Sequence, residues 1–288
     1  MSEIIDGKKL AEKIKDKIVK EIIETRHASS LRDDRPNLAI ILVGERDDSS
    51  LYVGLKEKEA KKVGVDTHLY KCPENISEKE ILEIIDHLNN DALIDAILVQ
   101  LPLPEGLDAD KIIRAINPSK DVDGFHPDNL KELLGTCGDT YIMPPVFAVV
   151  LEMLKSVNYE IADKRVCVIS NSEIFGKSLA KVLECRGAKA AAVYEDDKYL
   201  KNKTSKADIL ITAVGKPKFV KKDMVKKGAI VIDIGIIKKG KKVYGDVDFE
   251  DVKEKAGFIT PVPGGVGPLT IAMAFKNVLE LRKKRIKN

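Results

Sequence analysis

Tyr52 and Lys56 are a pair of residues whose types and spacing could support chemistry. They lie four residues apart in a segment, about 50–63, that is expected to be a helix ended by Gly64, so their Cβ atoms should lie about 5–6 Å apart on one face. A lysine has a reference pKa near ~10.4, and it can act as a base or proton shuttle at neutral pH only if that pKa is lowered. A lone lysine on a helix is usually a solvated charge, so the weight of this pair depends on its neighbours.

Further polar side chains follow a buried strand and occupy a later loop. The segment 99–104, Val-Gln-Leu-Pro-Leu-Pro, places Gln100 at the carboxyl end of an apolar run. In open parallel sheets that edge is where ligands bind. The segment 120–125, Lys-Asp-Val-Asp-Gly-Phe, adds Asp123, a second carboxylate and a flexible glycine. Gln100 and Asp123 therefore join Lys56 as candidates for one site.

The elements that must position these residues alternate between helix and strand. Asp6 can cap a first helix, whose apolar stripe recurs every fourth residue at Leu10, Ile14, Ile18 and Ile22. The predicted strands are 38–43, 65–70, 94–99, 165–170, 188–194, 209–213 and 229–233. The later predicted helices lie near 50–63, 146–155 and 176–186, and two more begin near 77 and 269. Continuous apolar strands that alternate with helices indicate parallel sheets covered on both faces, and we expect a domain boundary near 140–148.

Length and composition exclude several classes of protein. A chain of 288 residues suits one large domain or two ordinary ones, and 44% hydrophobic residues allow a sizeable core. The 49 basic and 46 acidic side chains give a net charge of only +3, which argues against a dedicated nucleic-acid binder. No apolar run approaches the ~20 residues of a membrane span, and the N-terminus lacks a signal-peptide pattern. We expect a soluble, cytoplasmic protein that binds neither nucleic acid nor membrane.

The cysteines and histidines are scattered, without C-x-x-C or H-E-x-x-H spacing. The cysteines are Cys72, Cys137, Cys167 and Cys185. We therefore expect free thiols in a reducing compartment and no metal site. The basic run 282–285 is interpreted as a solvated helix end, whose cations suit the negative end of the helix dipole.

Several segments resemble the signatures of the bifunctional methylenetetrahydrofolate dehydrogenase/methenyltetrahydrofolate cyclohydrolase family. They are 52–56 (Tyr-Val-Gly-Leu-Lys), 99–104, 120–125 and 261–270 (Pro-Val-Pro-Gly-Gly-Val-Gly-Pro-Leu-Thr). Segments 5–7 and 245–249 also match the family pattern. All of them occur in family order and spacing, so the resemblance covers essentially the whole chain, and the ten-residue segment is specific by itself.

The resemblance implies an α/β fold of two domains with a cleft between them. Residues 1–145 and the C-terminal helix 270–288 would form the catalytic, folate-binding domain, and 146–269 a Rossmann-like NAD(P)-binding domain. The implied reactions are oxidation of 5,10-methylenetetrahydrofolate to 5,10-methenyltetrahydrofolate with NAD(P)+, and then hydrolysis to 10-formyltetrahydrofolate. The family also implies a homodimer.

The resemblance further assigns roles to residues. Lys56 would assist water attack, Tyr52 would lie against the folate ring and Gln100 would contact Lys56. Asp123 would anchor the pterin, because a carboxylate accepts two N–H bonds from a guanidine-like edge. These four are the expected catalytic residues. The expected substrate-binding residues are Tyr52, Val99, Gln100, Leu101, Asp123, Pro263, Gly264 and Gly265. The expected cofactor-binding residues are Ser170, Asn171, Ser172, Ile174, Gly176, Glu195, Gly215, Gly235 and Ile236.

The nucleotide half departs from the family pattern. The loop 170–176 reads Ser-Asn-Ser-Glu-Ile-Phe-Gly, where the family usually has Gly-Arg-Ser-x-x-Val-Gly. Asn171 and Glu195 replace an arginine and a serine that help hold the 2′-phosphate of NADP. An acidic residue about 20 positions beyond the glycine turn normally binds the ribose 2′-hydroxyl and repels a 2′-phosphate. NADP is usual in the family, but we expect NAD to be preferred here, unless Glu195 belongs to a solvated turn or Lys177 or Lys198 supplies the missing cation.

Two alternatives to the bifunctional enzyme stay open at this point. One is a cyclohydrolase with a vestigial nucleotide site, which would not reduce NAD or NADP. The other is a non-catalytic folate- or nucleotide-binding protein. The lysine counts against the second alternative, because binding alone does not require it.

Overall fold

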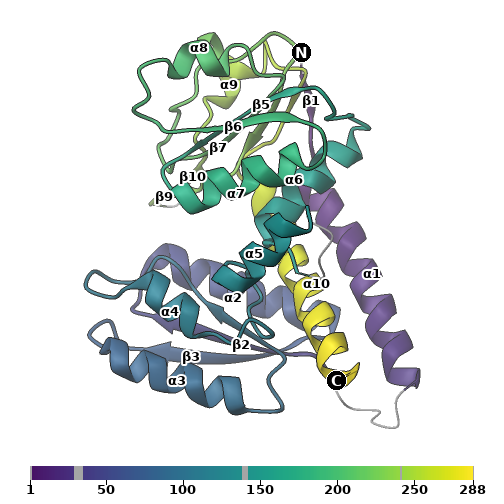
Figure 1. Ribbon diagram of the computed structural model, residues 1–288, viewed down its shortest axis with the longest axis vertical. Coiled ribbons are helices and arrows are strands. Elements are labelled where there is room, and N and C mark those ends of the chain that lie inside the picture. Colours follow the sequence, from purple (N-terminus) through teal and green to yellow (C-terminus); the bar gives the residue numbers. More distant parts are fainter. Residues whose placement is uncertain (1, 29–34, 138–141, 241, 288) are drawn as a thin grey trace. The chain divides into compact units, whose positions relative to one another are not determined.

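The computed structural model describes residues 2–28, 35–137, 142–240 and 242–287, and the chain forms two compact units (Figure 1). Unit 1 comprises Met1–Ala11, Leu133–Asp139 and Val146–Thr270. Unit 2 comprises Glu12–Glu132, Thr140–Pro145 and Ile271–Asn288. Each unit has its own parallel sheet, so the α/β fold expected from the sequence is confirmed. The cleft expected between the domains stays a prediction.

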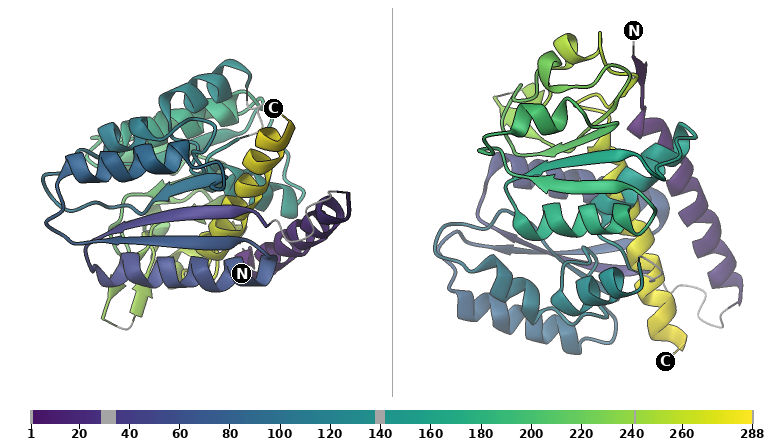
Figure 2. Two further views of the ribbon diagram at one scale, coloured as in Figure 1. Left: turned by 90° about the horizontal axis from the view of Figure 1, so that it is seen from below. Right: turned by 45° about the horizontal axis from the view of Figure 1, so that its top comes forward.

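Unit 2 is built on a three-stranded parallel sheet in the order β3-β2-β4. Its strands are β2 (Asn37–Val43), β3 (Asp66–Cys72) and β4 (Ala96–Val99). Its helices include α2 (Asp47–Val63), α3 (Glu78–Asn90) and α4 (Ala109–Ala115), and parts of α1 (Gly7–Ala28), α5 (Pro127–Gly135) and α10 (Val266–Lys287). Every residue of β2 after Asn37 is buried, as expected for a strand covered on both faces, and Figure 2 shows helices on either side of this sheet.

Local signals explain where three of the described helices begin or end. Ser77 and Glu80 form a reciprocal capping box at the start of α3. Gly64 ends α2 in the left-handed conformation, with a φ of 82° that favours glycine. The backbone N–H of Lys9 donates to Asp6 at 3.0 Å, so Asp6 caps α1 as expected.

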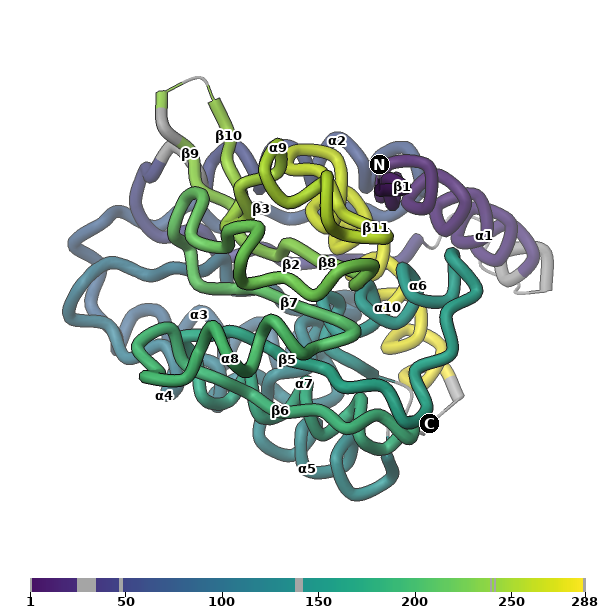
Figure 3. The backbone as a smooth tube through the Cα atoms, turned by 90° about the horizontal axis from the view of Figure 1, so that it is seen from above, coloured from purple at the N-terminus to yellow at the C-terminus, as the bar shows by residue number. Residues whose placement is uncertain are grey.

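Unit 1 is built on a six-stranded parallel sheet in the order β1-β11-β8-β7-β5-β6. Its strands are β1 (Glu3–Ile4), β5 (Arg165–Ser170), β6 (Lys189–Val193), β7 (Ile209–Ala213), β8 (Ile230–Asp233) and β11 (Phe258–Ile259). Its helices include α6 (Pro145–Ser156), α7 (Glu173–Glu184), α8 (Leu200–Thr204), α9 (Phe249–Val252) and the 3-10 turn η1 (Lys222–Met224). A hairpin of β9 (Ile237–Lys239) and β10 (Lys242–Tyr244) projects beyond the sheet (Figure 3).

The expectation that all four cysteines are free thiols is wrong. Cys137 and Cys185 form a disulfide with a Cα–Cα distance of 5.1 Å, whereas Cys72 and Cys167 are free and buried. Spacing could not reveal this pair, because 48 residues separate its members and only the fold brings them together.

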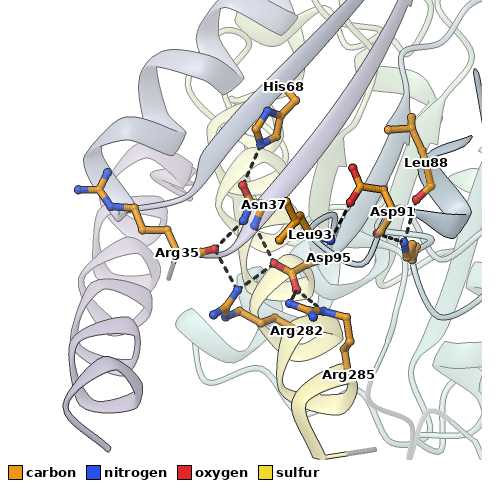
Figure 4. Close-up of polar contacts among 10 residues, drawn as sticks. Arg35, Asn37, His68, Leu88, Asp91, Leu93, Asp95, Arg282 and Arg285 are labelled. Atoms are coloured by element: carbon orange, nitrogen blue, oxygen red, sulfur yellow. Dashed lines mark hydrogen bonds and ion pairs between the residues drawn. The ribbon is translucent and has the colours of Figure 1, made fainter. Parts of the chain in front are cut away.

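The basic run 282–285 is not simply a solvated helix end. Arg282 is buried, and its guanidinium lies 3.1 Å from the carboxylate of Asp95, which is itself buried. Arg285 contacts the other oxygen of Asp95 at 2.7 Å. Figure 4 shows Asp95 between these two arginines at the end of α10. The run therefore ties α10 to the beginning of β4. Among the described helices, none is both long and apolar enough to cross a membrane.

Candidate active site

Lys56 and Gln100 meet in unit 2. Helix α2 carries Lys56, and Gln100 follows the last residue of β4. The Lys56 ammonium donates a hydrogen bond of 2.8 Å from Nζ to Gln100 Oε1. The Gln100 backbone N–H donates to Ile41 O at 2.9 Å, and its side-chain Nε2 donates to Leu101 O at 2.7 Å. The amide oxygen of Gln100 is therefore held toward Lys56 by bonds at both ends of the residue.

Asp123 adds a second charge beside Lys56. Desolvation lowers the pKa of the Lys56 ammonium, and the negative charge of Asp123 opposes this shift. Desolvation also raises the pKa of Asp123 to about 6, with Lys56 opposing and the charge of Asp121 adding to the rise. Each group is thus brought closer to neutral pH than its ordinary value, which is a property of catalytic acids and bases.

The loop that carries Asp123 is held by the preceding residues. Asp121 accepts hydrogen bonds from the backbone N–H groups of Gly124 (3.0 Å) and His126 (2.8 Å) and from Asn129 Nδ2 (3.0 Å). Lys120 Nζ donates to the carbonyls of Leu88 and Asp91, at the end of α3, at 2.8 and 2.7 Å. Asp121 and Lys120 lie inside the segment 120–125, although neither is among the residues that the sequence predicts for the site.

The other expected substrate residues of unit 2 lie around this pair. Tyr52 is half-buried on α2, one turn before Lys56. Val99, at the end of β4, is buried, and Leu101 is 43% exposed. Leu55, beside Lys56 on α2, is also an exposed apolar side chain. Apolar surface next to a few fixed polar groups is typical of small-molecule sites.

In unit 1, Ser170, Ser172 and Gly176 shape the turn from β5 to α7. Ser172 Oγ accepts the backbone N–H of Phe175 at 3.3 Å and caps α7, which explains why this helix begins before the predicted residue 176. Ser170 Oγ accepts the N–H of Ser172 at 3.1 Å. A Cβ added to Gly176 would lie 3.3 Å from Ala192 Cβ and 3.4 Å from Ser170 Cβ, so glycine lets α7 pack closely on the sheet. Ile174 is 48% exposed in the first turn of α7.

Charged and polar groups follow the strands on either side of β5. Glu195 comes two residues after β6, and its carboxylate lies 2.7 Å from the Lys216 ammonium, three residues after β7. Lys216 is not among the residues that the sequence predicts for the cofactor site. Asn171 Nδ2 donates to Val214 O at 3.1 Å, and Lys177 pairs with Glu173 on its own helix.

Two buried aspartates hold the loops that contain the expected cofactor residues Gly215, Gly235 and Ile236. Asp246 accepts the backbone N–H groups of Val214 (2.7 Å) and Lys216 (2.9 Å) on either side of Gly215. Asp233 accepts the N–H groups of Gly235 (3.0 Å), Asp246 (3.0 Å) and Val247 (2.9 Å). Desolvation and the charge of Asp246 raise the pKa of Asp233 to about 7, against the lowering effect of its hydrogen bonds. Of these two aspartates, only Asp246 lies in a segment that the family resemblance singles out, 245–249.

The expected substrate residues Pro263, Gly264 and Gly265 belong to unit 1. The backbone N–H of Lys8 donates to Gly264 O at 3.1 Å, and Gly264 has a φ of +111°. A Cβ added to Gly265 would lie 2.6 Å from Pro261 O. The positive φ thus explains glycine at position 264, and close backbone packing explains glycine at position 265. Among the described residues, no group of three or more His, Cys, Asp or Glu side chains could hold a metal ion.

The chain matches two family models that together cover most of its length. Residues 5–123 match the tetrahydrofolate dehydrogenase/cyclohydrolase catalytic domain, and residues 144–286 match the NAD(P)-binding domain of the same proteins. A bifunctional protein FolD of Nitratiruptor sp. is 47% identical over 98% of this chain and 99% of that protein.

Solved structures agree with these matches. The bifunctional methylenetetrahydrofolate dehydrogenase/cyclohydrolase of Campylobacter jejuni is 37% identical, with a TM-score of 0.91 over 99% of this chain and 100% of that chain. The enzyme of Trypanosoma brucei, solved with NADP and an inhibitor, is 31% identical, with a TM-score of 0.94 over 100% of this chain and 99% of that chain. The NAD-dependent enzyme of Saccharomyces cerevisiae, at 20% identity, shares the fold, with a TM-score of 0.83 over 98% of both chains.

Proposed function

The chain belongs to the tetrahydrofolate dehydrogenase/cyclohydrolase family, and we propose that Lys56, Gln100, Asp123 and Tyr52 perform its folate chemistry. It is a bifunctional enzyme that oxidises 5,10-methylenetetrahydrofolate to 5,10-methenyltetrahydrofolate and hydrolyses the product to 10-formyltetrahydrofolate. The observation that carries the proposal is the 2.8 Å hydrogen bond from Lys56 to Gln100 beside the carboxylate of Asp123.

Lys56 serves the hydrolytic step by moving protons. In that step water adds to the methenyl carbon, and its oxygen loses both protons as the formyl C=O forms. One proton goes to N5 as the bond from this carbon to N5 breaks, the other is released, and the formyl group stays on N10. Because desolvation lowers its pKa, the Lys56 amine is more readily deprotonated than an exposed lysine. The cationic methenyl group lowers this pKa further, since like charges disfavour the ammonium. Gln100 holds Nζ in place by accepting a hydrogen bond from one of its N–H groups.

Asp123 and the apolar surface near it bind the folate. The ionised carboxylate of Asp123 accepts paired N–H bonds from the amino and amide edge of the pterin. Tyr52 stacks against the ring system, and Val99, Gln100 and Leu101 line the same site. We propose that Pro263, Gly264 and Gly265 also bind the substrate.

The residues of unit 1 fit a dinucleotide. When bound, NAD(P)+ accepts the hydride that the methylene carbon loses. The close packing of Gly176 leaves the N-terminus of α7 beside the end of β5, and a helix N-terminus favours a phosphate. The residues proposed to hold the cofactor are Ser170, Asn171, Ser172, Ile174, Gly176, Glu195, Gly215, Gly235 and Ile236.

We propose that NAD is preferred over NADP. Glu195 follows the strand beside β5, where an acidic side chain accepts the ribose 2′-hydroxyl and repels a 2′-phosphate. Lys216, the cation next to Glu195, is already neutralised by it, and Lys177 is paired with Glu173. The ratio of kcat/KM for NAD to that for NADP tests the proposal, and a ratio below one would contradict it.

The domain limits and the assembly are also proposals. The catalytic domain comprises 1–145 and 270–288, the nucleotide domain comprises 146–269, and the enzyme is a cytoplasmic homodimer, as the family resemblance implies. Light scattering after gel filtration checks the dimer, which is expected at twice the 31.8 kDa of one chain.

Replacing Lys56 tests the assignment of the hydrolytic step. Lys56→Gln keeps a polar side chain of similar length but carries no titratable proton. With methenyltetrahydrofolate as substrate, we expect its hydrolysis to slow at least about 100-fold, the range of one general acid–base catalyst. Lys58→Gln, an exposed position two residues later on α2, is the matched control and should hydrolyse at the wild-type rate.

A further inference from the structure

Asn277, on helix α10, bridges two distant segments of unit 2. Its side chain is buried, and Nδ2 donates to Val122 O at 2.8 Å and to Met143 O at 2.9 Å. An asparagine amide has two N–H donors, so both are used. Val122 and Met143 precede Asn277 in the chain by 155 and 134 residues. The reactions described above require no direct role for Asn277.

The first of these hydrogen bonds acts directly on Asp123. The carbonyl of Val122 belongs to the peptide group that joins Val122 to Asp123. Because a peptide group is planar, fixing its oxygen fixes the plane that precedes the Asp123 Cα. On the other side, the N–H of Gly124 belongs to the peptide group that follows Asp123, and it donates to Asp121 Oδ1 at 3.0 Å. Side chains therefore hold both peptide planes that flank Asp123.

The second hydrogen bond holds the segment that packs against this loop. Gly124 has a φ of +66°, and a Cβ added there would lie 3.0 Å from the backbone N of Pro144. Met143, whose carbonyl Asn277 also binds, directly precedes Pro144. Asn277 thus holds the loop and the backbone against which the loop rests.

Helix α10 is a firm support for such a contact. Arg282 lies five residues after Asn277, or about 7.5 Å along the helix axis. Its ion pair with the buried Asp95, together with that of Arg285, fixes the helix against the sheet of unit 2 (Figure 4). Position 277 is therefore set by a rigid element and not by a loop.

We propose that Asn277 is a positioning residue for Asp123, whose carboxylate it aims at the pterin edge of the folate. The inference rests on the proposed role of Asp123. It extends the folate site from the segments around Lys56 to the C-terminal helix.

The test compares variants of the full-length enzyme with methenyltetrahydrofolate as substrate and no nucleotide. Asn277→Leu keeps the branched shape of the side chain, although with a larger volume, and removes both donors. We expect its folate KM to rise about tenfold, its kcat to change less than threefold and its Kd for NAD to stay at the wild-type value. Asn277→Gln retains the donors on a longer side chain, and it should recover part of the loss.

Two controls separate positioning from stability. Lys276→Met changes the exposed neighbour on the same helix and should leave the folate KM unchanged. Arg285→Met removes the more exposed of the two ion pairs with Asp95 and leaves the buried Arg282 pair to hold α10, so it should lower the Tm but not raise the KM. If Asn277→Leu does not fold, the folate KM of Asn277→Ser, which lacks the amide, is compared with that of Asn277→Gln, which keeps it.

An unchanged folate KM in folded Asn277→Leu would overturn the inference. The inference would also be overturned if Arg285→Met lowered the Tm as much as Asn277→Leu does and raised the folate KM by the same factor. Asp123→Asn shows which proposal has failed: if it also leaves the folate KM unchanged, the role of Asp123 is wrong, and if it raises the KM while Asn277→Leu does not, only the role of Asn277 is wrong.

Discussion

Lys56 Nζ and Gln100 Oε1 lie 2.8 Å apart, with the lysine as donor. Their chain positions are 44 residues apart, one on a helix and the other just after a buried strand. Because Gln100 is itself bound through its backbone and side-chain amide groups, it gives Lys56 a fixed partner. The bond uses one N–H of the ammonium and leaves the others for substrate and water.

Replacing Gln100 by glutamate should move the pH dependence of hydrolysis. Gln100→Glu places a carboxylate next to Lys56, and an opposite charge at this distance raises the pKa of an ammonium. If the neutral amine takes part, the alkaline rise of kcat should shift upward by about one pH unit or more. Gln100→Leu is the matched neutral variant and should lower the rate without an upward shift. The pH profile of kcat measures both, and an unmoved profile for Gln100→Glu would count against the role of the pair.

Folate binding should weaken in mild acid because of Asp123. Desolvation raises its pKa to about 6, so the carboxylate is ionised above this pH and protonated below it. Only the ionised form accepts both N–H bonds of the pterin edge. The folate KM of hydrolysis should therefore rise as the pH falls from 7 to 5, by about tenfold per unit below the pKa. Asp123→Asn should show a high KM without this pH dependence; a variant that keeps the wild-type profile would exclude Asp123 as its source.

Cofactor choice should respond to the pair of Glu195 and Lys216. Glu195→Gln removes the charge that repels a 2′-phosphate and releases Lys216 to bind one. The kcat/KM for NADP should rise about tenfold relative to that for NAD. Adding Lys216→Gln to this variant should remove the gain, whereas adding Lys227→Gln, a change at an exposed lysine outside the proposed cofactor site, should not. Unchanged specificity in Glu195→Gln would refute the proposed preference.

The ion pair of Arg282 with Asp95 should be a large contributor to stability. Their side chains are 6% and 0% exposed, and removing one partner of a buried pair leaves an uncompensated charge, at a cost of about 3–5 kcal/mol. Because Arg285 still contacts Asp95, the loss of unfolding free energy in Arg282→Met should be near the lower end of this range. Urea unfolding provides the measurement, with Lys276→Met as a surface control expected within about 0.5 kcal/mol of wild type. A loss as small as that of the control would show that the pair is not stabilising.

Much of the architecture could be predicted from periodicity and capping. The strand 165–170 and the strand 209–213 have the predicted limits, and the other expected strands differ by at most two residues at either end. The family matches confirm the bifunctional enzyme over the two alternatives left open by the sequence. The strands β1 and β11 were missed because two residues carry no periodic signal and their pairing is a tertiary event.

The contacts that support the site are less visible in the sequence. Lys56, Gln100 and Asp123 stand in recognisable segments, but the partners of Asp95 and of Val122 lie more than 150 residues away on α10. The pairing of Cys137 with Cys185 has the same cause, since no local pattern records proximity that only the fold creates. Residues that hold a site in place are therefore harder to predict than those that touch its ligand.

A single-turnover experiment with Lys56→Gln tests the central claim most directly. The variant is mixed with NAD+ and methylenetetrahydrofolate, and reduced cofactor, methenyltetrahydrofolate and 10-formyltetrahydrofolate are followed together. Hydride transfer depends mainly on positioning, so reduced cofactor should form while methenyltetrahydrofolate accumulates in an equal amount. If 10-formyltetrahydrofolate appears as fast as in the wild-type enzyme, Lys56 does not carry the hydrolytic step.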